Sequence, residues 1–143
     1  MDPERFSEAW DEFFAAVRRA RGRAAQAQRP GALTLAQYQL LAVFDRETEL
    51  SVGDVALAGG VATPTATRML GALERDGIVA RQASEVDRRS VLVRLTPHGR
   101  RILKAKREVV QAKQQAIYES LNGDERRQAE SILRRLAVAM EDL

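Results

Sequence analysis

The chain has 143 residues and a formal net charge of +3, with 23 lysines and arginines against 20 aspartates and glutamates. This length is typical of one domain with its own hydrophobic core. The sequence contains no cysteine, which excludes disulfide frameworks, thiolate metal sites and thiol nucleophiles. It has no apolar run long enough for a membrane span, and the start MDPERFSEAW lacks the layout of a signal peptide, so we expect a cytoplasmic protein.

The positive charge is concentrated in one part of the chain. Eight arginines and four carboxylates fall between residues 61 and 101, so this segment alone carries +4. A concentrated positive field is the electrostatic footprint of a nucleic-acid-binding surface. A solvated charged surface would have the same composition, so charge by itself does not decide between the two.

The first predicted element is a long amphipathic helix. Its apolar residues recur in steps of four and three, as expected for one face of a helix: Phe6, Trp10, Phe13, Val17, Ala20 and Ala24. We expect the helix to end near Gln28, because Arg29 precedes Pro30 and Gly31 follows.

Two shorter helices follow. The first begins at Thr34, where the spacing to Gln37 predicts a capping box. Its expected core residues are Leu35, Tyr38, Leu41 and Phe44. The second begins at Ser51 and ends at the pair Gly59-Gly60, and its apolar residues are Val52, Val55 and Ala56.

A fourth helix is predicted with Thr63 as N-cap, Pro64 as first helical residue and Gly77 as its stop. We expect it to bury Ala66, Met69, Leu70 and Leu73. The residues expected to project outward are then Thr65, Arg68, Ala72 and Arg75.

The period changes after Gly77. Residues 78–83 and 91–96 read as two strands, and the polar loop 84–90 joins them. Thr96 and Pro97 then cap and start a fifth helix that runs to about Ser120. Asn122 with Glu125 caps a last helix, whose apolar stripe comprises Ala129, Ile132, Leu133, Leu136, Met140 and Leu143.

Three short helices followed by a hairpin are the order of a winged helix-turn-helix, whose second turn helix enters the major groove of DNA. In the fourth helix, Arg68 is placed to bridge the two acceptors on a guanine edge. At the loop tip, Arg88 and Arg89 suit a narrow minor groove, and Asp87 is placed to brace a neighbouring arginine through a charge-assisted pair.

Two segments carry a family resemblance. The chain resembles regulators of the multiple-antibiotic-resistance (MarR) type in the run TPTATRMLGALERDGIVAR from Thr63 and in the run DRRSVLVRLTPHGRRIL from Asp87. The resemblance extends over essentially the whole chain. The combination of Asp-x-Arg-Ser, a strand and Leu-Thr-x-x-Gly is specific, although none of its pieces would be alone. The pair Gly59-Gly60 departs from the usual leucine-containing end of the third helix.

The resemblance implies a mainly α fold with a small β-hairpin wing in a single domain, 1–143. It implies a winged helix-turn-helix lobe at 32–97 and dimerisation helices at 1–29 and 98–143. Thr34 and Ser51 match capping positions that can also touch phosphates. With these two, the residues expected at DNA are Thr63, Pro64, Thr65, Thr67, Arg68, Arg75, Asp87, Arg88, Arg89 and Ser90.

The apolar stripes of the first, fifth and sixth helices are too extensive for a three-helix head to cover, which favours a homodimer. Two heads about 34–36 Å apart would meet a near-palindromic operator in double-stranded DNA. The alternative is a monomeric bundle that folds the stripes onto the head.

The resemblance also implies a small aromatic or phenolic effector that releases DNA. Residues that could line its cleft are Trp10, Phe13, Phe14, Tyr38 and Phe44, although their helical spacing favours plain core.

Other functions are weighed against this one. An enzyme would need acid–base or nucleophilic groups in a cleft, and the single histidine, His98, is expected at the surface. We therefore expect neither catalysis nor a cofactor or metal. A winged-helix adaptor that binds protein is the alternative, and the arginines of the wing argue against it. The effector, the operator sequence, the target genes and the choice between repression and activation have no signal in the sequence.

Overall fold

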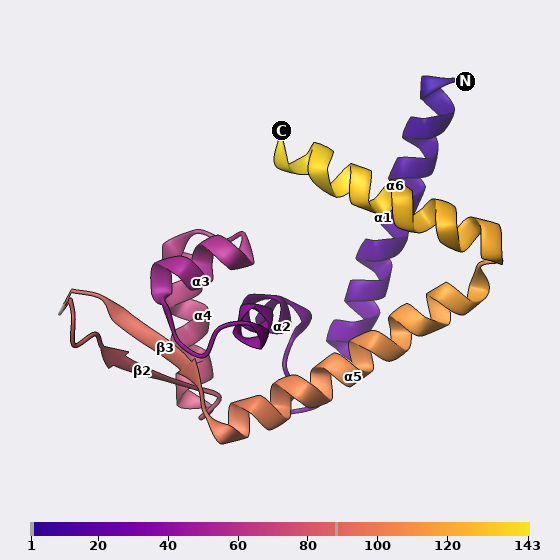
Figure 1. The fold of residues 1–143 in the computed structure, drawn as a ribbon. Coiled ribbons are helices and arrows are strands. Elements are labelled where there is room, and N and C mark those ends of the chain that lie inside the picture. Colours follow the sequence, from indigo (N-terminus) through magenta and orange to yellow (C-terminus); the bar gives the residue numbers. More distant parts are fainter. Residues whose placement is uncertain (1, 88) are drawn as a thin grey trace. The chain divides into compact units, whose positions relative to one another are not determined.

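A computed structural model describes residues 2–87 and 89–143 of the chain, and within them it contains six α-helices, one 3₁₀ helix and a small sheet (Figure 1). In chain order the elements are α1 Pro3–Gln26, α2 Leu35–Leu41, η1 Ala42–Asp45, β1 Leu50–Ser51, α3 Val52–Gly59, α4 Thr63–Arg75, β2 Val79–Ala83, β3 Val91–Leu95, α5 Pro97–Ser120 and α6 Gly123–Glu141. By their internal contacts the residues form two compact units, one up to Lys106 and one from Arg107 onward. The fold is thus mainly helical with a small antiparallel sheet, as predicted.

Helix α1 begins earlier than the apolar stripe indicates. The Asp2 side chain accepts a hydrogen bond from the Glu4 backbone N–H at 3.0 Å, and Pro3 occupies the first helical position. None of the residues Pro3–Gln26, all of which the structure describes, is buried. The apolar stripe of α1 is therefore exposed or half-buried in the single chain.

The predicted caps of α2 and α3 are confirmed. The Thr34 hydroxyl accepts from the Gln37 N–H at 3.1 Å, and the Gln37 side chain accepts from the Thr34 N–H at 2.9 Å. The Ser51 hydroxyl accepts from the Asp54 N–H at 3.1 Å. Gly60 caps the C-terminus of α3, and its φ of 64° is the left-handed conformation that glycine adopts freely.

The start of α4 differs from the prediction by one residue. Ala62 is the N-cap, with extended backbone angles and no side-chain cap, and Thr63 is already helical. The carbonyl of Ala62 accepts from the Ala66 N–H at 3.0 Å, so the first helical hydrogen bond starts before Thr63. Pro64 still fits at the second position, because N–H groups of the first turn have no partner in the helix.

The end of α4 is closed by Gly77, as predicted, with a φ of 73°. The Gly77 N–H donates to the Glu74 carbonyl at 3.0 Å, and the Ile78 N–H donates to the Leu73 carbonyl at 2.9 Å. This pair of bonds is a Schellman motif, which satisfies the last carbonyls of the helix and turns the chain into the sheet.

The sheet has three strands in the order β1-β3-β2, where the sequence predicted two. Strands β2 and β3 pair antiparallel with Arg81 opposite Val93. The third strand, β1, pairs Leu50 with Val93 on the other edge of β3. It was missed because two residues are too short to show an alternating pattern.

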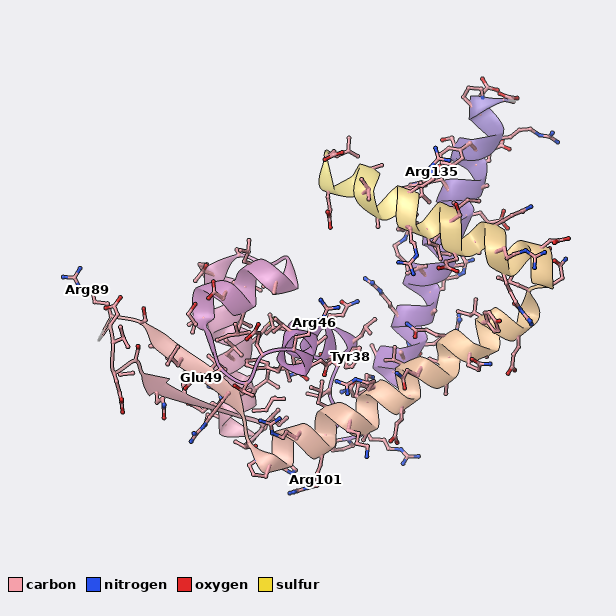
Figure 2. All side chains as sticks on the ribbon, in the orientation of Figure 1. Tyr38, Arg46, Glu49, Arg89, Arg101 and Arg135 are labelled. Atoms are coloured by element: carbon pink, nitrogen blue, oxygen red, sulfur yellow. The ribbon has the colours of Figure 1, made fainter. Side chains whose placement is uncertain are left out.

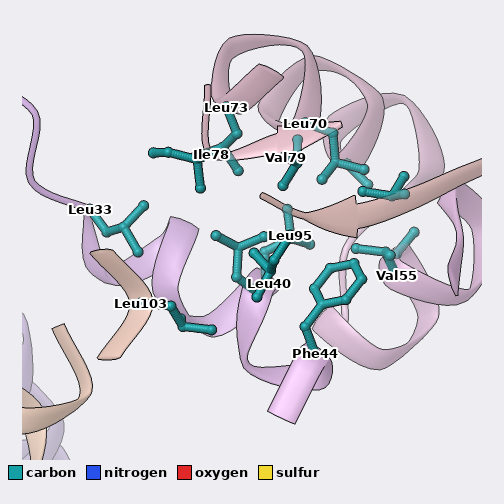
Figure 3. Close-up of a cluster of buried hydrophobic side chains, with 14 residues drawn as sticks. Leu33, Leu40, Phe44, Val55, Leu70, Leu73, Ile78, Val79, Leu95 and Leu103 are labelled. Atoms are coloured by element: carbon teal, nitrogen blue, oxygen red, sulfur yellow. The ribbon is translucent and has the colours of Figure 1, made fainter. Parts of the chain in front are cut away.

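A single core holds the head together (Figure 3), and helices α2, α3 and α4, the sheet and the start of α5 all contribute to it. The predicted core residues Leu41, Phe44, Val55, Ala56, Ala66, Leu70 and Leu73 are buried. Leu35, Tyr38, Val52 and Met69 are only half-buried, whereas Leu33 and Leu40 are buried without having been predicted. Leu33 precedes the α2 cap and Leu40 lies in the last turn of α2 before the tighter 3₁₀ segment, so helical periodicity identified neither.

The residues from Arg107 onward comprise the rest of α5 and α6. The predicted capping box is confirmed: Asn122 Oδ1 accepts from the Glu125 N–H at 2.9 Å, and the Glu125 carboxylate accepts from the Asn122 N–H at 2.8 Å. The stripe residues Ile132, Leu133 and Met140 are more than half exposed. Across the described ranges, the helices are too polar or too short to cross a membrane.

Candidate nucleic-acid interface

The outward face of α4 is set by its buried residues. Because Ala66, Leu70 and Leu73 anchor the helix, the positions opposite them face solvent, and Thr63, Pro64, Thr67, Arg68 and Arg75 are exposed. Thr65 and Ala72, predicted to project outward, are half-buried at the edge of the packed face. Thr67, the residue before Arg68, is exposed, and its hydroxyl donates to the Thr63 carbonyl at 2.9 Å.

The loop after β2 is held by hydrogen bonds to two side chains. The Ser84 hydroxyl accepts from the backbone N–H groups of Val86 and Asp87 at 3.2 and 3.3 Å. The Asp87 carboxylate accepts from the Arg89 N–H at 3.0 Å and from the Ser90 hydroxyl at 3.2 Å. The described residues of the loop are therefore held by the side chains of Ser84 and Asp87.

This arrangement bears on the role expected of Asp87 only as far as Arg89 is concerned. The pair with a neighbouring guanidinium was predicted, but towards Arg89 it is the backbone N–H that Asp87 binds. Arg88, the other predicted partner, lies outside the described residues. Asp87 thus acts on the shape of the turn and leaves the Arg89 side chain to project.

Arg89 is exposed, and Figure 2 shows its side chain at the far end of the hairpin, directed away from the sheet. Val86, on the same loop, is 98% exposed, which is unusual for a β-branched apolar side chain. A cation and an apolar group are therefore both presented at the tip. Val86 could not be predicted from the sequence, since an apolar residue in a loop has no periodic signal.

An ion pair connects the end of α4 to the base of the wing. An Arg81 guanidinium nitrogen lies 3.1 Å from a Glu74 carboxylate oxygen. The hydrogen bond from Arg81 holds the pKa of the Glu74 carboxyl below its ordinary value. This pair could not be predicted from the sequence, because the two residues lie on opposite sides of the Gly77 turn.

Thr34 and Ser51 lie at the N-termini of α2 and α3, where both hydroxyls act as caps. Thr34 is exposed and Ser51 is half-buried. Their caps are confirmed, and a contact with phosphate stays a prediction for each.

The five aromatic residues expected near an effector fall into two groups. Trp10, Phe13 and Phe14 contact one another on α1, with ring centroids 4.8 Å apart for Trp10 and Phe14 and 5.4 Å apart for Phe13 and Phe14. Phe44 is in the core of the head, and Tyr38 packs against that core. The preference for plain core was correct for Phe44 but wrong for Phe13 and Phe14, because α1 buries no residue in the single chain.

The known proteins that this chain is similar to are transcription regulators. The model of the MarR family matches residues 33–90. The HTH-type transcriptional regulator YfiV of Bacillus subtilis is 31% identical over 110 residues, which are 77% of this chain and 69% of the relative. The transcriptional activatory protein BadR of Rhodopseudomonas palustris is 38% identical over 95 residues, which are 64% of this chain and about half, 53%, of the relative.

Solved structures share the whole fold. The Streptococcus pneumoniae protein FabT, in complex with DNA, superimposes with a TM-score of 0.82 at 25% identity, covering 99% of each chain. The Bordetella bronchiseptica protein BpsR, whose DNA binding is regulated by 6-hydroxynicotinic acid, has a TM-score of 0.74 at 25% identity over 91% of this chain and 98% of its own.

Proposed function

Because the chain belongs to the MarR family of winged-helix, DNA-binding transcription regulators and is not an enzyme, we propose that it represses transcription as a homodimer bound to a near-palindromic operator. The observation that carries the proposal is the pairing of two exposed cationic surfaces on one head. These are the outward face of α4 with Arg68 and Arg75, and the wing tip with Arg89.

Each surface suits a different groove. Helix α4 presents short polar residues at its N-terminal end and Arg68 one turn further, so a base edge can be reached in the major groove. The wing extends the Arg89 guanidinium from a hydrogen-bonded turn, which suits the narrow minor groove beside it. The Glu74–Arg81 ion pair connects α4 to strand β2 of the wing, and so it helps to fix the distance between the α4 face and the wing.

Support for the homodimer comes from apolar surface that each unit leaves exposed. On α1, Phe6 and Phe13 are 60% and 57% exposed. On α6, Ile132, Leu133 and Met140 are 53–60% exposed. Patches of this kind on a monomer mark an interaction site, and a twofold partner would place two heads on successive major grooves.

The direction of regulation is part of the proposal. BadR is a transcriptional activator by name, so relatives of this chain do not all repress. Repression follows when the operator overlaps the promoter, because a bound dimer then excludes polymerase. A transcription assay with the chain's own upstream region separates the two outcomes.

The experiment that tests the proposal starts from DNA selected by the purified protein out of a randomised duplex library. Anisotropy titrations should give tight binding of two chains per selected duplex and weak binding of a scrambled duplex. Arg68→Ala should cost about 1–3 kcal/mol on the selected duplex and relax the preference at one base pair of each half-site. Equal affinity for the selected and scrambled duplexes would favour a protein-binding adaptor instead.

We also propose that a small aromatic acid releases the DNA. Two observations support this chemistry: BpsR is regulated by 6-hydroxynicotinic acid, and the head unit has a hollow of about 320 Å³ with Arg21 in its wall. The other lining residues are Ala25, Gln28, Thr34, Leu35, Ala36 and Gln39. A guanidinium beside apolar side chains suits an aromatic carboxylate.

Salicylate is a suitable probe for this effector. It should raise the melting temperature and weaken DNA binding over one concentration range, because a ligand shifts an equilibrium only by its differential affinity for the two states. Arg21→Gln should remove both effects and keep DNA binding in the absence of salicylate. Release by peroxide or zinc, with no response to aromatic acids, would contradict the proposal.

A further inference from the structure

Gly71 is a half-buried residue of α4 between two exposed arginines of its outward face. It is three residues after Arg68 and four before Arg75, so it shares their side of the helix. The two exposed arginines therefore stand one turn to either side of a half-buried position that has no side chain.

Nothing inside the described protein requires a glycine at this position. Its φ is not positive, unlike that of Gly60 and Gly77. A Cβ built on Gly71 would have no neighbouring atom within 4 Å. The contrast is Gly99, where a Cβ would lie 1.9 Å from the Ile78 carbonyl oxygen.

A glycine inside a helix also weakens the helix relative to alanine, because it gives up more backbone freedom on folding. Gly71 therefore destabilises α4 with no gain in the free chain. The physical use of a helical glycine with open space at its Cβ is to let another molecule approach the backbone more closely than a Cβ permits.

We propose that a DNA strand passes α4 at Gly71, with its sugar–phosphate backbone close to the helix backbone between Arg68 and Arg75. The inference rests on the proposed function, in which Arg68, nearer the helix N-terminus, reaches into the major groove. Gly71 is one turn further from that end, where the strand forms the rim of the groove. The Arg75 guanidinium then pairs with a phosphate oxygen beyond the glycine.

A matched pair of substitutions tests the proposal. Gly22 lies in the interior of α1, is exposed and would also meet no atom within 4 Å with a Cβ. Gly71→Ala and Gly22→Ala should both raise the melting temperature, by about 2–4 °C each. The effect on stability is thus the same for the two variants, and only the effect on DNA should differ.

DNA binding is measured by anisotropy on the selected duplex and on its scrambled form at several salt concentrations. Gly71→Ala should weaken both duplexes by about tenfold, because a strand contact carries no sequence information. Gly71→Leu should weaken them further, since leucine keeps the helix propensity and adds bulk. Gly22→Ala should bind as the wild type does.

Two results would overturn the inference. One is a Gly71→Ala variant that is more stable and binds both duplexes with unchanged affinity. The other is a loss confined to the selected duplex, which would place a base edge at Gly71. If the wild type bound the selected and the scrambled duplex with equal affinity, operator recognition would be refuted. The affinities of the wild type and Gly71→Ala for scrambled DNA would still decide the role of Gly71.

Discussion

At the scale of single residues, the wing shows how one carboxylate places a cation. Asp87 accepts hydrogen bonds from the Arg89 N–H and the Ser90 hydroxyl, and so it closes the turn from which the Arg89 side chain projects. Arg89 is exposed, so its charge is available to DNA at no cost in core packing. Asp87 is thus a positioning residue for the proposed minor-groove contact.

Arg89→Ala should weaken binding to selected and scrambled duplexes and should reduce the slope of log affinity against log salt by about 1. The physical reason is that one fewer cation displaces counterions from the DNA. Titrations across several salt concentrations measure the slope, with Lys113→Ala, an exposed cation on α5, as the control. An unchanged slope would mean that Arg89 is not at the DNA.

The Glu74–Arg81 pair gives a prediction with a defined pH dependence. Arg81 lowers the pKa of Glu74 from 4.5, so the pair stabilises the fold above that pH and the contribution is lost as the pH falls through the lowered pKa. Glu74→Gln should therefore be less stable than the wild type at neutral pH, and the difference should close in acid.

Urea unfolding of Glu74→Gln, Arg81→Gln and the double variant at neutral and acid pH measures this coupling. The pair is partly exposed, so the effect is expected to be small. A stability difference that is the same at both pH values would show that Glu74 acts through something other than its charge.

At the scale of elements, the junction of β3 with α5 joins the wing to the long helix. The Thr96 hydroxyl accepts a hydrogen bond from the Gly99 N–H at 2.9 Å. It donates to the carbonyl oxygens of Gly77 and Ile78, the residues of the turn at the end of α4. Gly99 is buried against the Ile78 carbonyl. The start of α5 and the end of α4 are therefore locked together by backbone contacts with no space for a Cβ.

Gly99→Ala should destabilise the fold by about 3 kcal/mol, because its Cβ would overlap the Ile78 carbonyl and force the backbone apart. Chemical denaturation measures the change. Gly22→Ala, which adds the same methyl group in open space, should stabilise the fold by about 0.5–1 kcal/mol. Equal effects of the two substitutions would contradict the close contact at Gly99.

At the scale of the whole molecule, the exposed apolar surface is the main feature that the single chain leaves unexplained. The head has a core of its own, with Leu41, Leu70, Leu73 and Val93 fully buried. Helices α1 and α6, each described over its full length, contain no buried residue. The proposed homodimer would bury these helices, and it would set the spacing of the two heads.

Leu136→Asp tests this assembly, since it places a charge in the apolar stripe of α6, where burial would leave it unpaired. The variant should sediment as a monomer or unfold, whereas the wild type should sediment as a dimer at micromolar concentration. Ser131→Asp, an exposed position on the other side of α6, is the control and should remain dimeric. A wild type that sediments as a monomer would refute the proposal.

Much of this protein could be predicted from its sequence because the decisive interactions are local. The caps at Thr34, Ser51 and Asn122 join residues three apart, and the stops at Gly60 and Gly77 depend on backbone angles that glycine adopts freely. Periodicity located β2, β3 and most of the core, because the alternation of residues along a strand or helix is also local. The two segments around α4 and the wing identified the family.

Tertiary structure alone decided the features that depend on partners distant in the chain. Strand β1 exists because β3 offers it an edge, and Leu33 is buried because other elements cover it. The packing of α4 left Thr65 and Gly71 half-buried, with Gly71 between the outward arginines Arg68 and Arg75. A local pattern specifies a hydrogen bond or the apolar face of a helix. Which residues near the edge of that face become buried is set by contacts that form only when the whole head has folded.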